Sequence, residues 1–100
     1  MSPRIVRRLN LRGNWSVYIL RCRDQTLYTG ISKDVQARVK AHSLGKGAAY
    51  TRGRGPLRLL YEERGLTLSQ ALIREAQIKK LPRAQKEELI KKARVTRKPS

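Results

Sequence analysis

Two apolar runs with one tyrosine each, separated by a short polar break, constrain the fold of this chain more than any other feature. They span about residues 15–23 and 27–31, and the polar residues 24–26 between them are typical of a turn. Alternate side chains of a strand point to the same face. The pattern therefore predicts a β-hairpin that presents two phenols, those of Tyr18 and Tyr28.

Further periodic patterns after the hairpin predict a helix, a third strand and two more helices. The expected ranges, in chain order, are 33–43, 57–64, 68–80 and 84–93. Ser32 offers an N-cap for the first helix, and Gly65 is expected to end the strand. Thr67 and Gln70 form a capping box for the second helix, and Pro82 suits the first turn of the third. We expect an α+β fold, a small three-stranded antiparallel sheet flanked by three helices in the order β-β-α-β-α-α.

The length of 100 residues favours a single small domain, whose core must be aliphatic because Phe is absent. We expect this domain to span residues 15–93. Residues 1–14 carry four arginines and no acid, which favours a basic flexible arm. An organelle transit peptide is the alternative interpretation of this segment. Residues 94–100 are expected to form a basic disordered tail.

Positive charge is the dominant global property of the chain. Lys and Arg number 24 against 7 Asp and Glu, which gives a formal net charge of +17. Such a balance favours a polyanionic partner, and we expect nucleic acid, in the form of DNA. A membrane surface is disfavoured because the chain has no long apolar run. A basic surface that is merely solvated remains an open alternative.

Cysteine usage limits the chemistry further. Cys22 is the only cysteine, so the chain can form neither an internal disulfide nor a thiolate zinc cluster. The apolar residues near the start are isolated and do not form the apolar segment of a signal peptide. We therefore expect a cytoplasmic protein.

A basic loop is expected at residues 45–56, because four glycines and a proline in twelve residues disfavour any regular element. Lys46, Arg52 and Arg54 lie in this loop. Backbone amides and guanidinium groups of such a loop can contact phosphates, although a flexible exposed connection has the same composition. Together with Lys33 before the loop, these three residues are our predicted nucleic-acid contacts.

Five side chains form a candidate catalytic set: Tyr18, Tyr28, Arg38, His42 and Glu75. Arg38 and His42 lie one turn apart on the first predicted helix, whereas Glu75 falls within the apolar stripe of the second. Phosphodiester hydrolysis requires an activated water, a cation at the phosphate and a metal held by hard oxygen. A phenol or imidazole can activate water, a guanidinium matches two phosphate oxygens, and one carboxylate suffices for Mg²⁺.

Each member of this set also has a purely structural interpretation. Glu75 would then form a buried ion pair with Arg38, His42 would be a hydrogen-bonded core residue, and the tyrosines would fill the core. The apolar stripe that includes Glu75 is expected to be the buried side of its helix, and it consists of Leu68, Ala71, Leu72 and Ala76. The other acids are expected at a turn, at a cap or on exposed faces: Asp24, Asp34, Glu62, Glu63, Glu87 and Glu88.

These residues resemble the GIY-YIG nuclease superfamily. The two tripeptides that name this family are similar to two that lie on the predicted hairpin, Val17-Tyr18-Ile19 and Tyr28-Thr29-Gly30. The family's helical arginine matches Arg38, the histidine or tyrosine that follows it matches His42, and its later metal-binding glutamate matches Glu75. The resemblance covers about residues 15–82 and points to the small stand-alone bacterial members.

Some positions depart from the family pattern. Val17 and Thr29 replace a glycine and an isoleucine, and neither bears a reacting group. The asparagine that many members have after the glutamate has no counterpart here. Residues 42–51 are similar to the structure-specific branch, which cuts branched DNA.

The resemblance implies hydrolysis of DNA with one divalent ion, Mg²⁺ or Mn²⁺, held by Glu75. Tyr18 would activate the attacking water, Tyr28 and His42 would orient or assist it, and Arg38 would stabilise charge on the phosphate. The implied protein is a metal-dependent endonuclease. The finer expectation is that it selects DNA by structure and acts in DNA repair or recombination. The alternatives are a non-catalytic basic module that binds DNA or RNA, and a ribosome-associated basic protein.

Overall fold

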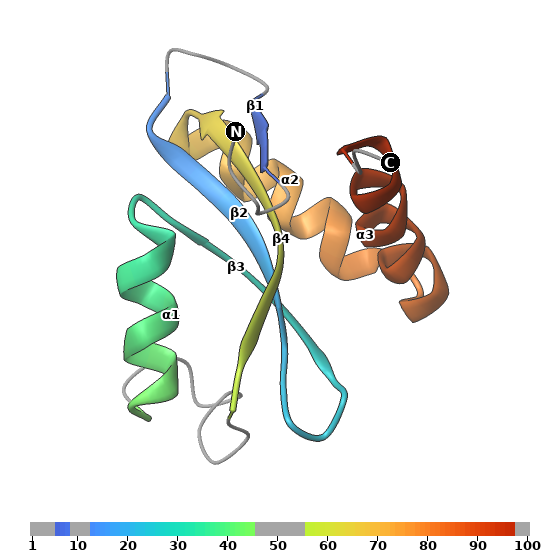
Figure 1. Ribbon diagram of the computed structural model, residues 1–100. Coiled ribbons are helices and arrows are strands. Elements are labelled where there is room, and N and C mark those ends of the chain that lie inside the picture. Colours follow the sequence, from blue (N-terminus) through green and yellow to red (C-terminus); the bar gives the residue numbers. More distant parts are fainter. Residues whose placement is uncertain (1–5, 9–12, 46–55, 98–100) are drawn as a thin grey trace.

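The computed structural model of the chain describes residues 6–8, 13–45 and 56–97. The elements of these residues are, in chain order, β1 (Val6–Arg8), β2 (Trp15–Arg21), β3 (Leu27–Ser32), α1 (Val35–Ser43), β4 (Arg58–Leu66), α2 (Leu68–Lys80) and α3 (Arg83–Arg97) (Figure 1). The predicted α+β class and the β-β-α-β-α-α order from β2 onward are confirmed. None of these helices is long and apolar enough to cross a bilayer.

The strands form one sheet in the order β1-β4-β2-β3. β4, β2 and β3 pair antiparallel, as predicted. β1 adds a parallel edge strand next to β4, with Val6 opposite Glu62. This strand lies in the segment 1–14 that was expected to be a flexible arm. A single valine followed by two arginines has no strand alternation, and its partner strand lies far along the chain, so local pattern could not predict the pairing.

Helices cover both faces of the sheet. Figure 1 shows α1 on one side, with α2 and α3 on the other. Alternation along β2 sends its side chains to both sides. On the α2 side, the buried cluster consists of Val17, Ile19, Tyr61, Leu66, Ala71, Ile78 and Ile90. On the α1 side, the buried cluster consists of Tyr18, Leu20 and Val35.

The N-terminal cap of α2 is formed by the predicted residues, whereas the cap of α1 is formed by a different residue than predicted. α2 begins with the predicted capping box, in which Thr67 and Gln70 each bond the backbone N–H of the other. α1 is capped by Asp34, two residues after the predicted Ser32. The Asp34 carboxylate accepts from the Ala37 N–H at 3.1 Å, while the Ser32 hydroxyl accepts from the Asp34 N–H at 3.0 Å. An ionised oxygen at the cap also interacts favourably with the helix dipole.

Two elements extend beyond their predicted ends. β4 continues through Gly65, which has a φ of +84° and lies at a bulge where the register opposite β2 shifts between Trp15 and Val17. A glycine with positive φ adds a residue at a bulge without ending the strand. α3 continues to Arg97, so residues 94–97 of the expected tail are helical. Pro99 is the next helix breaker in the sequence.

The buried side of α2 differs from the expected stripe. Ala71 is buried as expected, but Leu68, Leu72 and Ala76 are exposed, and Ile78 is buried instead. Two acids expected on exposed faces, Glu62 and Glu63, are also buried. The buried side of α2 and the burial of Glu63 have a common cause in the packing of α2 against Glu63, which is described below. Glu62, its neighbour along β4, points to the other face of the sheet and pairs with Arg64.

Candidate active site

Tyr18 lies at the centre of the candidate site, on the central strand β2. It pairs across the sheet with Gly30 of β3, while Tyr28 occupies the diagonal position on the same face. The two rings are tilted against each other with centroids 6.4 Å apart. A Cβ atom at position 30 would lie 2.6 Å from the Tyr18 Oη and 3.1 Å from the Tyr28 Cε2. The absence of a side chain at Gly30 therefore makes room for both phenols.

Helix α1 brings His42 onto the two phenols. The Tyr18 Oη and the His42 Nε2 are 3.0 Å apart, within hydrogen-bond distance, and both side chains are buried. The His42 ring also meets Tyr28 edge-on, with centroids 5.2 Å apart. Val35 and Val39 dock the same side of α1 on the sheet. The side of α1 that carries Val35, Val39 and His42 is thus the side that faces the site.

The electrostatics of this cluster favour neutral rings. Burial first, and then the nearby Tyr28, raise the pKa of Tyr18 to about 12, against the lowering effect of the hydrogen bond and the charge of Arg38. Burial first, and then the charge of Arg38, lower the pKa of His42 below its usual 6.5. At neutral pH the pair is therefore a neutral phenol next to a neutral imidazole, between which a proton can be exchanged along the hydrogen bond.

Glu75 approaches the site from α2. Its negative charge contributes to the raised pKa of Tyr18, which places the carboxylate within electrostatic reach of the phenol. The side chain is only 19% exposed, and its Oε2 lies 3.2 Å from the Nζ of Lys79. The structural interpretation expected an ion pair between Glu75 and Arg38. The structure instead pairs Glu75 with Lys79, one turn along α2.

The carboxylate of Glu75 fits a divalent ion of the hard type. Among the residues that the structure describes, no group of three or more His, Cys, Asp or Glu side chains is arranged to hold a metal ion. Glu75 is the carboxylate whose charge acts on Tyr18. One carboxylate suits Mg²⁺ or Mn²⁺, because such an ion keeps several waters and takes further oxygens from a substrate phosphate.

The predicted nucleic-acid contacts are only partly described. Lys46, Arg52 and Arg54 lie outside the described residues. Lys33 is exposed, and its Nζ lies 5.6 Å from the centroid of the Trp15 ring, a cation–π arrangement. Lys33 therefore extends from the protein surface with an aromatic ring beneath it.

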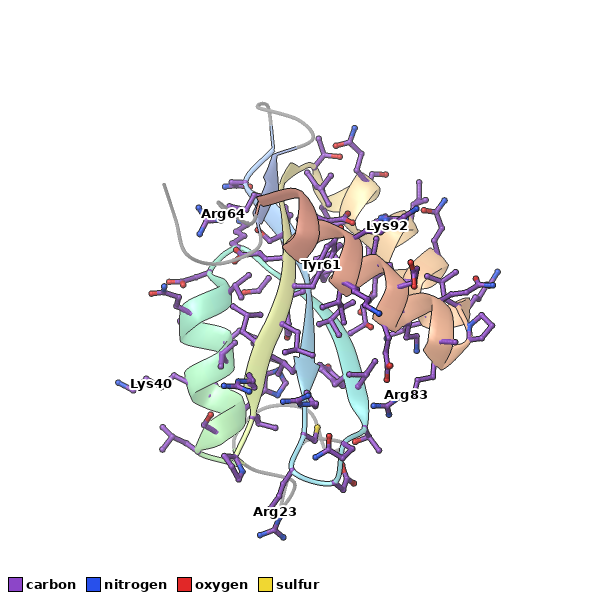
Figure 2. All side chains as sticks on the ribbon, turned by 45° about the vertical axis from the view of Figure 1, so that its right-hand side comes forward. Arg23, Lys40, Tyr61, Arg64, Arg83 and Lys92 are labelled. Atoms are coloured by element: carbon purple, nitrogen blue, oxygen red, sulfur yellow. The ribbon has the colours of Figure 1, made fainter. Side chains whose placement is uncertain are left out.

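Basic side chains project in several directions around the domain. Figure 2 shows Arg23 at the tip of the β2–β3 hairpin, Lys40 on the outer side of α1, and Arg83 and Lys92 on α3. Among the residues that the structure describes, these basic side chains therefore come from different elements and do not lie on one helix or strand alone. This arrangement favours contacts to phosphates on more than one side.

A second polar cluster lies on the opposite face of the sheet, and sequence reasoning missed it. The Glu63 carboxylate is fully buried, accepts from the Tyr61 hydroxyl at 2.6 Å, and receives two donor groups of Arg74 from α2. The adjacent pair Glu62 and Glu63 could have signalled it. A strand covered on both faces must bury one side chain of any neighbouring pair on each side.

Comparison with known proteins identifies the family of the chain. A sequence profile described as the GIY-YIG catalytic domain matches residues 14–88. A UPF0213 protein from Oceanobacillus iheyensis is 53% identical over 74 residues, which are 74% of this chain and 86% of that protein. A UPF0213 protein from Natronomonas pharaonis is 51% identical over 74 residues, which are 74% of this chain and 87% of that protein.

Solved structures show the same relationship. The solution NMR structure of a UPF0213 protein from Bacillus halodurans has a TM-score of 0.51 and 45% identity, covering 77% of this chain and 82% of that one. The solution NMR structure of a protein from E. faecalis has a TM-score of 0.58 and 32% identity, covering 87% and 93%. With its matching domain and its UPF0213 relatives, this chain belongs to the GIY-YIG family, whose fold is that of a nuclease.

Proposed function

We propose that this protein is a divalent-metal-dependent endonuclease that hydrolyses phosphodiester bonds of DNA. The observation that carries the proposal is the convergence of a hydrogen-bonded phenol and imidazole with the charges of Arg38 and Glu75 around Tyr18. A phenol, an imidazole, a guanidinium and a carboxylate are the groups that metal-assisted phosphodiester hydrolysis requires. Membership of the GIY-YIG family supports the same reaction class.

The proposed mechanism divides the roles among these side chains. Glu75 would hold Mg²⁺ or Mn²⁺. When bound, the ion would supply positive charge that stabilises the negative charge of phosphodiester hydrolysis. Arg38 binds the phosphate oxygens with its planar guanidinium, which fits them better than an ammonium group does. Tyr28 orients the attacking water beside Tyr18.

The raised pKa of Tyr18 decides how this phenol acts. A phenol with a pKa of about 12 is protonated at neutral pH and cannot accept a proton unless it gives up its own. The neutral His42 imidazole, 3.0 Å away, can take that proton as Tyr18 receives one from water. Tyr18 is also fully buried, so substrate must uncover it. Arg38, whose charge acts on the phenol, can do so by moving toward a phosphate.

Selectivity for DNA structure over DNA sequence is the finer part of the proposal. The basic side chains labelled in Figure 2 project on several sides of a single small domain. Contacts from these side chains to phosphates would position a nucleic acid without carrying sequence information directly. Such a distribution suits junctions and flaps, where duplex arms leave in different directions, and it supports a role in DNA repair or recombination.

The test is a cleavage assay with Mg²⁺ or EDTA on single-stranded, duplex and branched DNA. We expect Mg²⁺-dependent cleavage that is lost in Glu75→Ala and in Arg38→Ala. Glu88→Ala is the matched control, because it removes a carboxylate from an exposed position on α3 and should retain activity. Cleavage that survives both site variants would refute the site. Absence of cleavage of every DNA form, with binding retained, would favour the non-catalytic binding module.

A further inference from the structure

Lys79 forms an ion pair with Glu75, the carboxylate proposed to hold the metal. It lies one turn after Glu75 on α2, and its Nζ is 3.2 Å from the Glu75 Oε2. The lysine side chain is 54% exposed, so it can move, whereas the carboxylate is 19% exposed and faces the site. Lys79 also belongs to the last turn of α2, where the helix dipole favours a cation. In the protein without substrate, the negative charge of Glu75 is therefore already paired with the ammonium group of Lys79.

A divalent ion bound to Glu75 would be repelled by this ammonium group, which weakens metal binding. Both would lie within a few ångströms of one carboxylate, and their like charges repel. Arg38 adds a further positive charge beside Tyr18. Positive charge at the site therefore exceeds negative charge once a metal is present. A phosphate backbone is the ligand that corrects this imbalance, because it brings negative charge for the metal, for Arg38 and for Lys79 at once.

We propose that Lys79 couples metal binding to nucleic-acid binding by holding Glu75 until a phosphate draws its ammonium group away. This inference rests on the proposed function of the site. Without nucleic acid, Lys79 opposes the metal. With nucleic acid, the lysine moves onto a phosphate and leaves both carboxylate oxygens to the ion. Coupling of this kind is reciprocal, so the metal must also tighten nucleic-acid binding by the same factor.

The experiment measures Mn²⁺ binding by electron paramagnetic resonance, with and without a non-cleavable phosphorothioate DNA. Lys79→Gln removes the ion pair, and Lys80→Gln is the matched control, since it removes the same charge from the next residue of α2. We expect Lys79→Gln to bind Mn²⁺ about three- to tenfold more tightly without DNA, the effect of removing one charge ~6 Å from a divalent ion in water. The enhancement of Mn²⁺ binding by DNA should fall by a similar factor.

The controls separate the possible results. Lys80→Gln should stay within twofold of the parent, and Lys79→Arg should restore the coupling because it keeps the charge. Equal effects of Lys79→Gln and Lys80→Gln would overturn the proposal, since they would reflect only the net charge. Mn²⁺ binding that is lost in Glu75→Gln but unchanged in Lys79→Gln would also overturn it, while leaving the metal site intact. Mn²⁺ binding indifferent to Glu75→Gln would overturn both the coupling and the proposed function.

Discussion

Replacing Arg74 by methionine should test how α2 is held on the sheet. In the native protein its Nε lies 2.9 Å and 3.1 Å from the two Glu63 carboxylate oxygens, and its Nη2 lies 2.9 Å from Oε2. Methionine keeps much of the aliphatic volume but removes every donor. The Glu63 carboxylate, fully buried, would then keep the Tyr61 hydroxyl at 2.6 Å but lose its counter-ion.

The expected cost follows from the burial of the two partners. Removing one partner of a buried ion pair costs about 3–5 kcal/mol, because the other charge remains buried and uncompensated. The Arg74 side chain is 30% exposed, so water can reach part of the space it leaves, and we expect about 3 kcal/mol. For a domain of this size that corresponds to a fall in Tm of roughly 12–24 °C. Such a loss is a large fraction of a typical stability of about 5–15 kcal/mol.

Urea denaturation followed by circular dichroism measures this cost. Arg83→Met is the matched control, because Arg83 pairs with Glu87 at an exposed site and should contribute less than about 1 kcal/mol. The double variant Glu63→Met with Arg74→Met should recover most of the stability, since it buries no charge. A cost below about 1 kcal/mol for Arg74→Met, or a double variant no more stable than the single one, would refute the reasoning.

Four further predictions concern the site and the basic charge of the chain. The pKa of Tyr18 is raised from 10.0 in the unfolded chain to about 12 in the folded protein, so its contribution to stability is complete below pH 10 and is lost as the pH rises toward 12. Unfolding measured between pH 9 and 12 should show the free energy of unfolding fall by about 2 kcal/mol, and Tyr18→Phe should abolish this fall. The lowered pKa of His42 has the opposite consequence, a loss of stability as pH falls below 6.5, measurable by NMR titration of the ring and by unfolding. Gly30→Ala should cost about 1–3 kcal/mol in unfolding assays and abolish cleavage, since its Cβ would displace both phenols; wild-type activity would contradict the placement of Tyr18 and Tyr28. DNA binding should weaken steeply with salt in a fluorescence anisotropy titration, and a flat response would contradict phosphate contacts as the source of affinity.

Features governed by neighbouring residues could be predicted from the sequence. The β2–β3 hairpin follows from strand alternation around a polar turn, and the start of α2 follows from Thr67 and Gln70, which bond each other's backbone. The candidate site residues on α1 also follow from local periodicity, because Arg38 and His42 are one turn apart. Their meeting with Tyr18 required only that α1 pack on the face of the hairpin that carries the phenols.

Features that depend on distant partners could not be predicted in this way. The rotation of α2 was expected to follow its apolar residues, but Leu68 and Leu72 are exposed. The buried side instead carries Ala71 and Ile78 together with Arg74, which contacts the buried Glu63 on β4. The pairing of β1 with β4 is likewise long-range. The strength of the Arg74–Glu63 contact comes from burial, and β1 pairs with a strand far along the chain; a local sequence pattern reports neither.

The rotation of α2 connects the two faces of the sheet. Along β4, Glu63 pairs with Val17 and points toward α2, whereas Tyr18, the next residue of β2, points toward α1. Arg74 reaches Glu63, and the following residue, Glu75, is rotated about 100° around the helix. That rotation brings the carboxylate within electrostatic reach of Tyr18. An ion pair on the face away from the phenols therefore sets where the proposed metal ligand lies. If Arg74→Met folds but leaves α2 free to rotate, Glu75 no longer acts on Tyr18, and an ultraviolet titration should show the pKa of that phenol falling slightly, because Glu75 is the smallest contribution to it.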